Sequence, residues 1–213
     1  MGGMRMPLIF LSAFFLLPEP ATQADPVAKP AFKACIATDE DRPAPRKVMR
    51  EAVRAVSEEF RRHAGIEIAA SHFAALPPGR NAGAWVVGRA LAEFCPKGAD
   101  VFIVFHEWKK TVNEPGPDGA YLTREYAGEA ETCFGVATVY GASERLKAKD
   151  AAGKPQLHGV LKHELGHLFG LDHEAGTESF MHESVAASKN GWTEDIASKL
   201  RRSPEPVDLK CRR

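Results

Sequence analysis

The sequence has neither an excess of charge of one sign nor a tract of basic residues. Its 28 Lys and Arg residues balance 28 Asp and Glu residues, so the formal net charge is zero. A surface that binds nucleic acid or an anionic membrane needs clustered positive charge. The composition therefore gives no indication of a nucleic-acid or membrane-surface partner, and we expect none.

The sequence also lacks an apolar run long enough to cross a bilayer. The run near the N-terminus covers residues 7–17 (PLIFLSAFFLL), which is short of the ~20 residues that a spanning helix needs. Arg5 precedes it, and Thr22-Gln23-Ala24 supplies the small residues of a cleavage site. We therefore expect residues 1–24 to be a signal peptide and residues 25–30 a linker. The mature protein would be secreted, periplasmic or extracellular, without a stable membrane anchor.

No internal repeat or low-complexity segment interrupts the rest of the chain. The 213 residues are 44% hydrophobic, which suits one globular domain with a real core. We assign that domain to residues 31–203 and a C-terminal tail to residues 204–213, and we expect a monomer.

Cysteines are few, and none is in a C-x-x-C arrangement. Cys35, Cys95, Cys133 and Cys211 all follow the expected signal peptide, so in an oxidising compartment they suggest two disulfides with three possible pairings. We prefer Cys35–Cys211 together with Cys95–Cys133. Free buried thiols are the alternative.

The most informative stretch is HELGHLFGLDH, which follows the pattern H-E-x-x-H-x-x-G-x-x-H. His163 and His167 are four residues apart, so on a helix both rings leave the same face and can bind one ion. Gly170 can adopt the left-handed backbone that ends a helix and turns the chain sharply. The turn would bring back His173 as a third ligand.

Three protein ligands with one open position are typical of a catalytic zinc ion, whereas a structural zinc ion is closed by four. Glu164 lies about 100° around the helix from His163, outside the ligand set but close enough to hold a water. We predict one zinc ion bound by His163, His167 and His173, with Glu164 as the catalytic general base. A helix with solvated histidines is the alternative.

This motif is followed by Met181, eight residues after His173. The combination resembles the signature of the metzincin clan of zinc endopeptidases, and the sequence HELGHLFGLDHE is most similar to that of its matrixin branch. The resemblance implies that Met181 forms a Met-turn, a hydrophobic base beneath the histidines. The residues that bind a second zinc ion and calcium in matrixins have no clear match, so we expect one zinc ion and no calcium.

The resemblance also implies an α+β, metzincin-like (zincin) fold. This fold has a twisted, mostly parallel sheet with an antiparallel edge strand, a backing helix, an active-site helix, the Met-turn and a C-terminal helix. Apolar patterning predicts strands at 31–38, 66–73, 99–108 and 133–140, and helices at 46–63, around 85–94, from 156 onward and after Thr193. The composition of residues 111–132 predicts a long surface loop.

Within this fold, residues 133–140 would be the antiparallel edge strand that lines the cleft. An extended substrate would pair with that strand through its main chain, and Gly135 would allow close approach. The residues expected to contact substrate are Phe134, Gly135, Val136, Ala137 and Thr138.

These features predict a secreted zinc-dependent endopeptidase that hydrolyses peptide bonds of peptide or protein substrates with a Glu-activated, zinc-bound water. The alternative is a non-catalytic, zinc-containing domain that binds a peptide or inhibitor, which a fourth ligand such as Glu183 would favour. A third possibility is a hydrolase whose narrow cleft accepts one partner only. The roles of His182 and Glu183, the S1′ preference and the natural substrate are left open.

Overall fold

The computed structural model describes residues 31–39, 43–76, 84–95, 97–115 and 121–206. The expected signal peptide and linker, and Cys211, lie outside these ranges. None of the described helices combines the length and the apolar character needed to cross a membrane.

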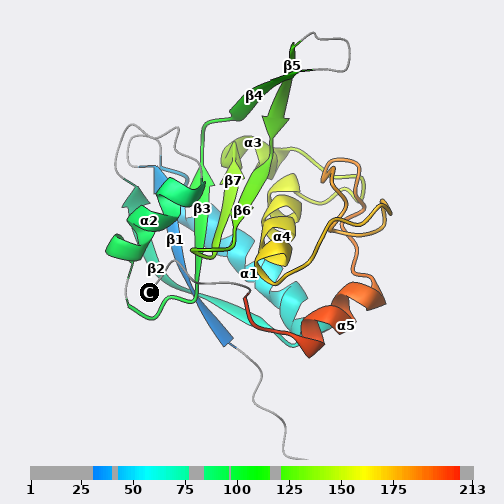
Figure 1. Ribbon diagram of the computed structural model, residues 1–213, viewed down its shortest axis with the longest axis horizontal. Coiled ribbons are helices and arrows are strands. Elements are labelled where there is room, and N and C mark those ends of the chain that lie inside the picture. The colour runs from blue at the N-terminus through cyan, green and yellow to red at the C-terminus, as the bar shows by residue number, and fades with distance from the viewer. Residues whose placement is uncertain (1–30, 40–42, 77–83, 96, 116–120, 207–213) are drawn as a thin grey trace, which may run out of the picture.

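The centre of the fold is a five-stranded sheet with the strand order β2–β1–β3–β7–β6 (Figure 1). Strand β1 pairs in parallel with β2 and β3, strand β3 pairs in parallel with β7, and β6 pairs antiparallel with β7. The bounds are β1 Ala31–Asp39, β2 Glu67–Leu76, β3 Val101–His106, β6 Gly128–Glu131 and β7 Val136–Tyr140. The predicted α+β fold, a mostly parallel sheet with one antiparallel edge strand, is confirmed.

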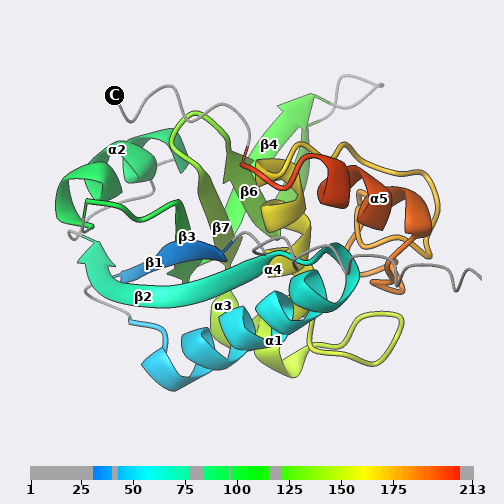
Figure 2. The ribbon, with the colours of Figure 1, turned by 90° about the horizontal axis from the view of Figure 1, so that it is seen from below.

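Helices cover both faces of this sheet (Figures 1 and 2). Helices α1 (Arg46–Ala64) and α4 (Gln156–Leu168) pack on one face, and α2 (Ala84–Phe94) packs on the other. Strand β3 is buried on both sides because successive side chains alternate between the two packed layers. Its continuous apolar run follows from this position.

The helix boundaries follow local sequence signals. Helix α1 begins directly after Pro45, and Gly65, with a φ of 76°, ends it. The C-terminal helix α5 (Glu194–Arg202) begins at Thr193, whose side chain accepts a hydrogen bond from the Ile196 amide. The predicted helices at 46–63, 85–94 and after Thr193 are confirmed within one or two residues.

The prediction that residues 133–140 form the edge strand is wrong. Strand β7 lies inside the sheet between β3 and β6, runs parallel to β3, and is fully buried. The antiparallel edge strand is β6. The apolar sequence VATVY suits an interior strand covered on both faces, whereas the G-E-A-E sequence of β6 suits an edge.

The prediction of a long loop over residues 111–132 is also wrong. Strands β4 (Lys110–Pro115) and β5 (Tyr121–Tyr126) form an antiparallel hairpin that stands out from the body of the molecule (Figure 1), and β6 follows it directly. Apart from Gly128, the Gly and Pro residues that suggested a loop occupy positions 115–119, from the last residue of β4 onward. The flanking Thr, Val and Tyr residues favour strands.

The predicted disulfide pairing is wrong as well. Cys35 of β1 is bonded to Cys95, directly after α2, with a Cα–Cα separation of 6.1 Å. This bond excludes both Cys35–Cys211 and Cys95–Cys133. Cys35 faces the α2 side of the sheet, so it bonds to the cysteine that directly follows the helix on that face. Cys133 is also disulfide-bonded.

The connection before α4 contains no strand of the main sheet. It holds the short helix α3 (Ala142–Lys147) and a turn closed by an isolated bridge between Lys149 and Pro155. Asp150 stabilises this turn by accepting hydrogen bonds from the amides of Ala152 and Lys154. The turn delivers the chain to the first residue of α4.

Candidate metal centre

Helix α4 carries the first part of the candidate site. Apolar residues such as Leu161 and Leu165 anchor it in the core, while His163 and His167 leave the helix one turn apart on the side of the cleft. The helix ends at Leu168, and Gly170 takes the left-handed conformation with a φ of 79°.

That reversal brings His173 back toward the helix. The Nε2 atoms of His163 and His167 are 3.1 Å apart, and each lies 3.2 Å from Nε2 of His173. A tetrahedral zinc ion with bonds of 2.0–2.1 Å separates its nitrogen ligands by about 3.3 Å. The triangle therefore has the dimensions of three corners of a zinc site, and the three histidines can hold a metal ion.

The hydrogen bonds behind the rings also fit a metal. Nδ1 of His163 lies 3.0 Å from the Phe180 carbonyl, and Nδ1 of His167 lies 2.7 Å from the Leu171 carbonyl. A carbonyl only accepts, so each Nδ1 carries the proton and each neutral ring directs its Nε2 lone pair inward. Lone pairs this close together repel one another unless a cation lies between them.

Burial favours the neutral rings that metal binding requires. It lowers the pKa of His163 to about 4, even though the bond to the Phe180 carbonyl favours the protonated ring. Burial also lowers the pKa of His167. Protons therefore compete weakly for these two nitrogens near neutral pH.

Glu164 is next to the triangle and is almost completely buried, with 6% of its surface exposed. Burial, together with the nearby Glu129 carboxylate, raises the pKa of Glu164 to about 8. Its carboxylate lies against Gly128 of the edge strand, where a β-carbon would come within 2.5 Å of Oε1. A carboxyl group in this environment can accept and release a proton near neutral pH.

Met181 is fully buried and packs against helix α4 at Gly166. The backbone around it is held by the bond from the Glu174 amide to the Met181 carbonyl, 2.9 Å long. These contacts place the turn that contains Phe180 and Met181 directly beside the histidine-bearing part of α4.

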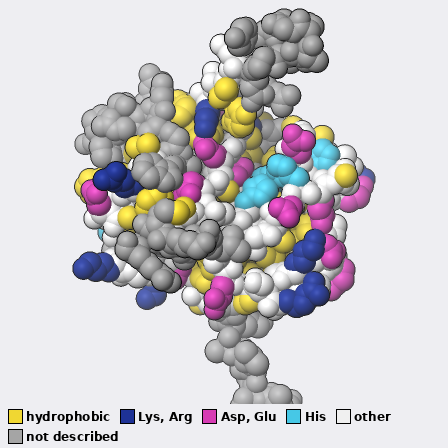
Figure 3. Space-filling model, viewed as in Figure 1, with side chains coloured by type: hydrophobic (Ala, Val, Ile, Leu, Met, Phe, Trp, Pro, Cys, Tyr) yellow, Lys and Arg dark blue, Asp and Glu magenta, His cyan; other side chains and the backbone are white. Residues whose placement is uncertain are grey.

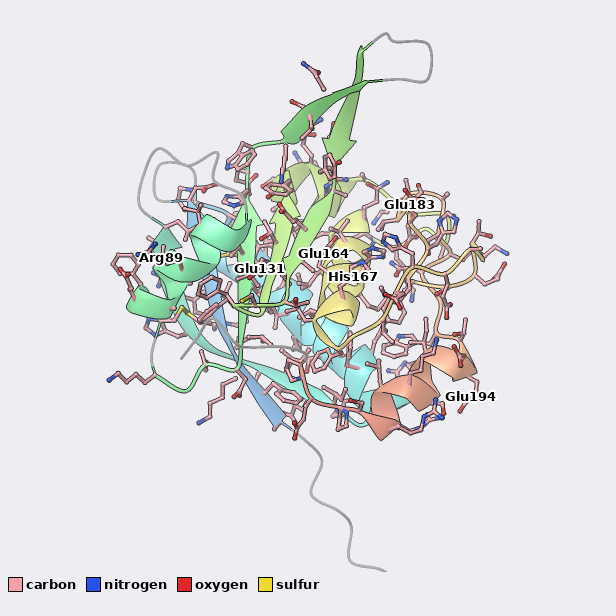
Figure 4. All side chains as sticks on the ribbon, in the orientation of Figure 1. Arg89, Glu131, Glu164, His167, Glu183 and Glu194 are labelled. Carbon is pink, nitrogen blue, oxygen red and sulfur yellow. A yellow bond between two sulfur atoms is a disulfide. The ribbon has the colours of Figure 1, made fainter. Side chains whose placement is uncertain are left out.

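The histidines open into a cleft of about 920 Å³. Figure 3 shows histidine side chains gathered on this face of the molecule, and Figure 4 shows Glu164 and His167 on α4 with Glu183 on the loop opposite. The cleft is bordered by the β4–β5 hairpin, by β6, by α4, and by the loop after Met181.

The structure brings together the predicted residues His163, Glu164, His167, His173 and Met181, but not the predicted substrate strand. Residues 134 and 136–138 are buried, and Gly135 lies in the turn before β7. Strand β6 borders the cleft in their place. The alternation of acidic and small residues over 128–131 was the available signal for it.

Sequence reasoning also missed a polar cluster at the cleft wall. Oε2 of Glu129 accepts hydrogen bonds from the Tyr140 hydroxyl at 2.9 Å and from Nζ of Lys110 at 2.5 Å. His182 and Glu183, whose roles were left open, line the cleft from the other side. Nδ1 of His182 accepts a hydrogen bond from the Ser184 amide. The candidate ligand group found among the described residues contains His163, His167 and His173, without His182.

The sheet is mainly parallel, the histidine-bearing helix ends in a glycine turn, and a methionine turn packs against that helix. Together these features define a metzincin-like zinc metallopeptidase. The sequence model of the matrixin family (peptidase M10) matches residues 91–197, half of the chain. The chain therefore belongs to the matrixin family, and its substrates are peptides or proteins. No curated protein shows significant sequence similarity to it.

Solved structures support the fold. The archaemetzincin AmzA from Methanopyrus kandleri superimposes with a TM-score of 0.56 and 22% identity, over 84% of this chain and 98% of that one. Metalloproteinase-II from Bacteroides fragilis gives a TM-score of 0.50 with 13% identity, over 82% of this chain and 53% of that one. At these identities the likeness shows a shared fold.

Proposed function

We propose that the protein is a secreted endopeptidase in which His163, His167 and His173 hold one zinc ion and Glu164 is the general base. The observation that carries this proposal is the triangle of Nε2 atoms, 3.1–3.2 Å on each side, with a buried carboxylate next to it at the cleft. A zinc ion held there would polarise the scissile carbonyl and make a nearby water more acidic.

Glu164 would take the proton from the attacking water and deliver it to the leaving amine. Its position supports this role, because the buried Glu164 carboxylate lines the same cleft as the three histidines, next to where the zinc ion would be held. No nucleophilic side chain is required, since water attacks directly. The neutral rings of His163 and His167 would keep the ion in place through the cycle.

Strand β6 would hold the substrate in an extended conformation. The Ala127 carbonyl accepts a hydrogen bond from the Tyr140 amide, and antiparallel pairs alternate between bonded and non-bonded residues. By that alternation, Gly128 and Ala130 direct their backbone groups away from β7. They are the best candidates for main-chain bonds to a peptide in the cleft, and they replace the residues predicted in β7.

Export to an oxidising compartment forms part of the proposal. The disulfide between Cys35 and Cys95, together with the bonded state of Cys133, supports it, because structural disulfides form and persist in such compartments. Cleavage after residue 24 would be read directly from the N-terminal sequence of protein recovered outside the producing cell.

The decisive experiment compares the mature protein with its Glu164→Gln variant on an unfolded protein substrate. The variant should retain one zinc ion per chain and lose at least about a hundredfold in kcat, the scale of a missing general base. Glu178→Gln is the matched control, because Glu178 is exposed and pairs with Lys189 on the surface. Cleavage by Glu164→Gln at the rate of the control would refute the mechanism.

A further inference from the structure

The extended segment that borders the cleft is longer than strand β6. Strand β5 (Tyr121–Tyr126) leads into β6 (Gly128–Glu131) with only Ala127 between them. Glu164 lies against Gly128, at this junction. The catalytic centre therefore faces a point with six residues of strand on one side and four on the other.

Each of these two strands has one partner among the described strands. Strand β6 pairs with β7, and β5 pairs with β4. Neither strand pairs with a second described strand along its other edge, and residues at the base of the hairpin line the same cleft as the three histidines. The hairpin residues that do so are Lys110, Val112, Glu125 and Tyr126.

The base of the hairpin is fastened to the body of the protein. Lys110 bonds to Glu129 of β6 at 2.5 Å, and its ammonium group lies 5.6 Å from the ring centres of Tyr126 and Tyr140. From α3, Arg145 reaches Glu125 at 3.0 Å. These contacts hold β5 in line with β6 before any ligand binds, which lowers the ordering cost of pairing with a peptide.

The same contacts decide what kind of ligand fits. Lys110 and Arg145 each have an acidic partner in the cleft wall, Glu129 and Glu125, so their charges are already balanced. A substrate side chain of either sign gains little from them. Recognition along this wall therefore falls to the main chain, which every peptide sequence provides.

We propose that β5 extends the substrate-binding edge beyond the catalytic centre, so that the enzyme prefers long, extended and unfolded polypeptide segments, with little dependence on side-chain charge in the flank that lies along the hairpin. This inference rests on the proposed peptidase function. Six residues at ~3.3 Å per residue give that flank about 20 Å of strand, and about half of these residues turn their backbone groups to the open edge.

The test uses the zinc-loaded wild-type protein and a set of peptides that share one cleavage site. Each flank is lengthened separately by one residue at a time, and kcat/KM is measured. We expect one flank to stop contributing after about four residues, the length of β6, and the other to continue to about six. The total gain along the longer flank should be at least about tenfold, the equivalent of one or two net hydrogen bonds.

Two further measurements separate main-chain pairing from other causes of a length effect. N-methylation of single residues in the longer flank should reduce kcat/KM at every second position, because only alternate residues face the strand edge. Reversing the charge of side chains in that flank should change kcat/KM less than threefold. A uniform response to N-methylation, or a strong response to charge, would overturn the proposal.

A shortened hairpin tests the same point from the enzyme side. Val112 pairs with Arg124, so replacing residues 113–123 with Asn-Gly closes a two-residue turn and keeps Lys110, Glu125 and their anchors. In this variant the gain in kcat/KM along the longer flank should stop after about three residues, because only residues 124–126 of β5 remain. If the variant does not fold, the peptide series on the wild-type protein decides.

The two proposals fail in different ways. Cleavage of all peptides with equal kcat/KM, whatever the length of either flank, would overturn the hairpin proposal and leave the peptidase function intact. Absence of cleavage of every peptide by the zinc-loaded protein would overturn the peptidase function and the hairpin proposal with it.

Discussion

Gly166 of helix α4 lies against the sulfur of Met181, at a distance that leaves no room for a β-carbon. A side chain at this position would overlap Sδ of Met181 and would also come within 3.0 Å of the Phe180 ring. Phe180 is the residue whose carbonyl accepts the bond from His163. The absence of a side chain at Gly166 therefore controls how closely the Met-turn approaches the histidines.

Gly166→Ala should weaken zinc binding. Overpacking in a core costs about 1–3 kcal/mol, and the better helix propensity of alanine offsets about 1 kcal/mol of this cost, so we expect a net loss of stability of no more than about 2 kcal/mol. Displacement of Phe180 should raise the zinc dissociation constant by about tenfold, the low end for groups that orient a ligand. Competition with a chromophoric chelator would measure this constant.

Gly176→Ala is the matched control, because a β-carbon at Gly176 meets no atom within 4 Å. It should leave both the zinc affinity and the free energy of unfolding unchanged within about 0.5 kcal/mol. Equal zinc affinity in the two alanine variants would show that the position of the Met-turn does not affect the metal.

Gly128→Ala should reduce the rate while leaving the metal in place. The new β-carbon would lie 2.5 Å from Oε1 of Glu164, so the carboxylate must move away from the position where it would receive a proton. We expect kcat to fall at least about tenfold, since a misplacement of about 1 Å can cost a hundredfold. Zinc content by metal analysis should remain one ion per chain. An unchanged kcat would mean that Glu164 does not act from this position.

Local features of the sequence predicted the candidate metal centre because its three histidines lie within eleven residues. The spacing of His163 and His167 acts through the helix repeat, and the reversal at Gly170 depends on the backbone of one residue. The disulfide partner of Cys35 and the position of β7 in the sheet depend instead on which elements pack together in the fold. The apolar sequence VATVY indicates burial but does not say which strands flank it, and spacing along the chain does not pair cysteines.

The hairpin was missed for a related reason. Composition averaged over residues 111–132 hid the short strands β4 and β5, which flank a Gly- and Pro-rich stretch of sequence. The cleft wall escaped prediction as a result, because Lys110 of β4 and Glu129 of β6 meet only through the packing of the hairpin against the edge strand of the other sheet. The Thr, Val and Tyr residues on either side of that stretch were the available signal for the two strands.

Glu59→Gln should destabilise the protein and change its response to acid. Nζ of Lys162, which is 2% exposed, lies 2.6 Å from Glu59, and the Trp192 indole donates to the same carboxylate at 3.1 Å. Burial alone would raise the pKa of Glu59, but the charge and hydrogen bond of Lys162 outweigh it and lower the pKa below 4.5. Glu59 therefore stabilises the fold above pH 4.5, and this contribution is lost as the pH falls through the lowered pKa.

The substitution leaves the buried Lys162 ammonium without its counter-charge, for which we expect a loss of about 3 kcal/mol at pH 7. Below pH 4.5, the stability of the variant should also fall less steeply than that of the wild-type protein. Urea unfolding between pH 3 and pH 8 would measure both effects. Lys162→Met is the control, and it should cost less because Glu59 is 26% exposed and can be solvated. Parallel pH profiles for wild type and Glu59→Gln would contradict this account.

The variants His173→Ala and His182→Ala should distinguish a zinc ligand from a histidine that only borders the cleft. Both histidines border the cleft, but Nε2 of His173 completes the triangle, whereas Nδ1 of His182 accepts a bond from the Ser184 amide. Loss of one of three ligands should lower zinc affinity at least about a hundredfold, so dialysed His173→Ala should contain little zinc. His182→Ala should keep its zinc ion.

Thermal unfolding gives an independent readout, because zinc at a hundredfold excess over its dissociation constant stabilises a folded protein by about 2.7 kcal/mol. That stabilisation should be present in wild type and His182→Ala, and should be abolished in wild type by a chelator. Zinc-dependent stabilisation of His173→Ala equal to that of wild type would exclude His173 as a ligand and with it the three-histidine site.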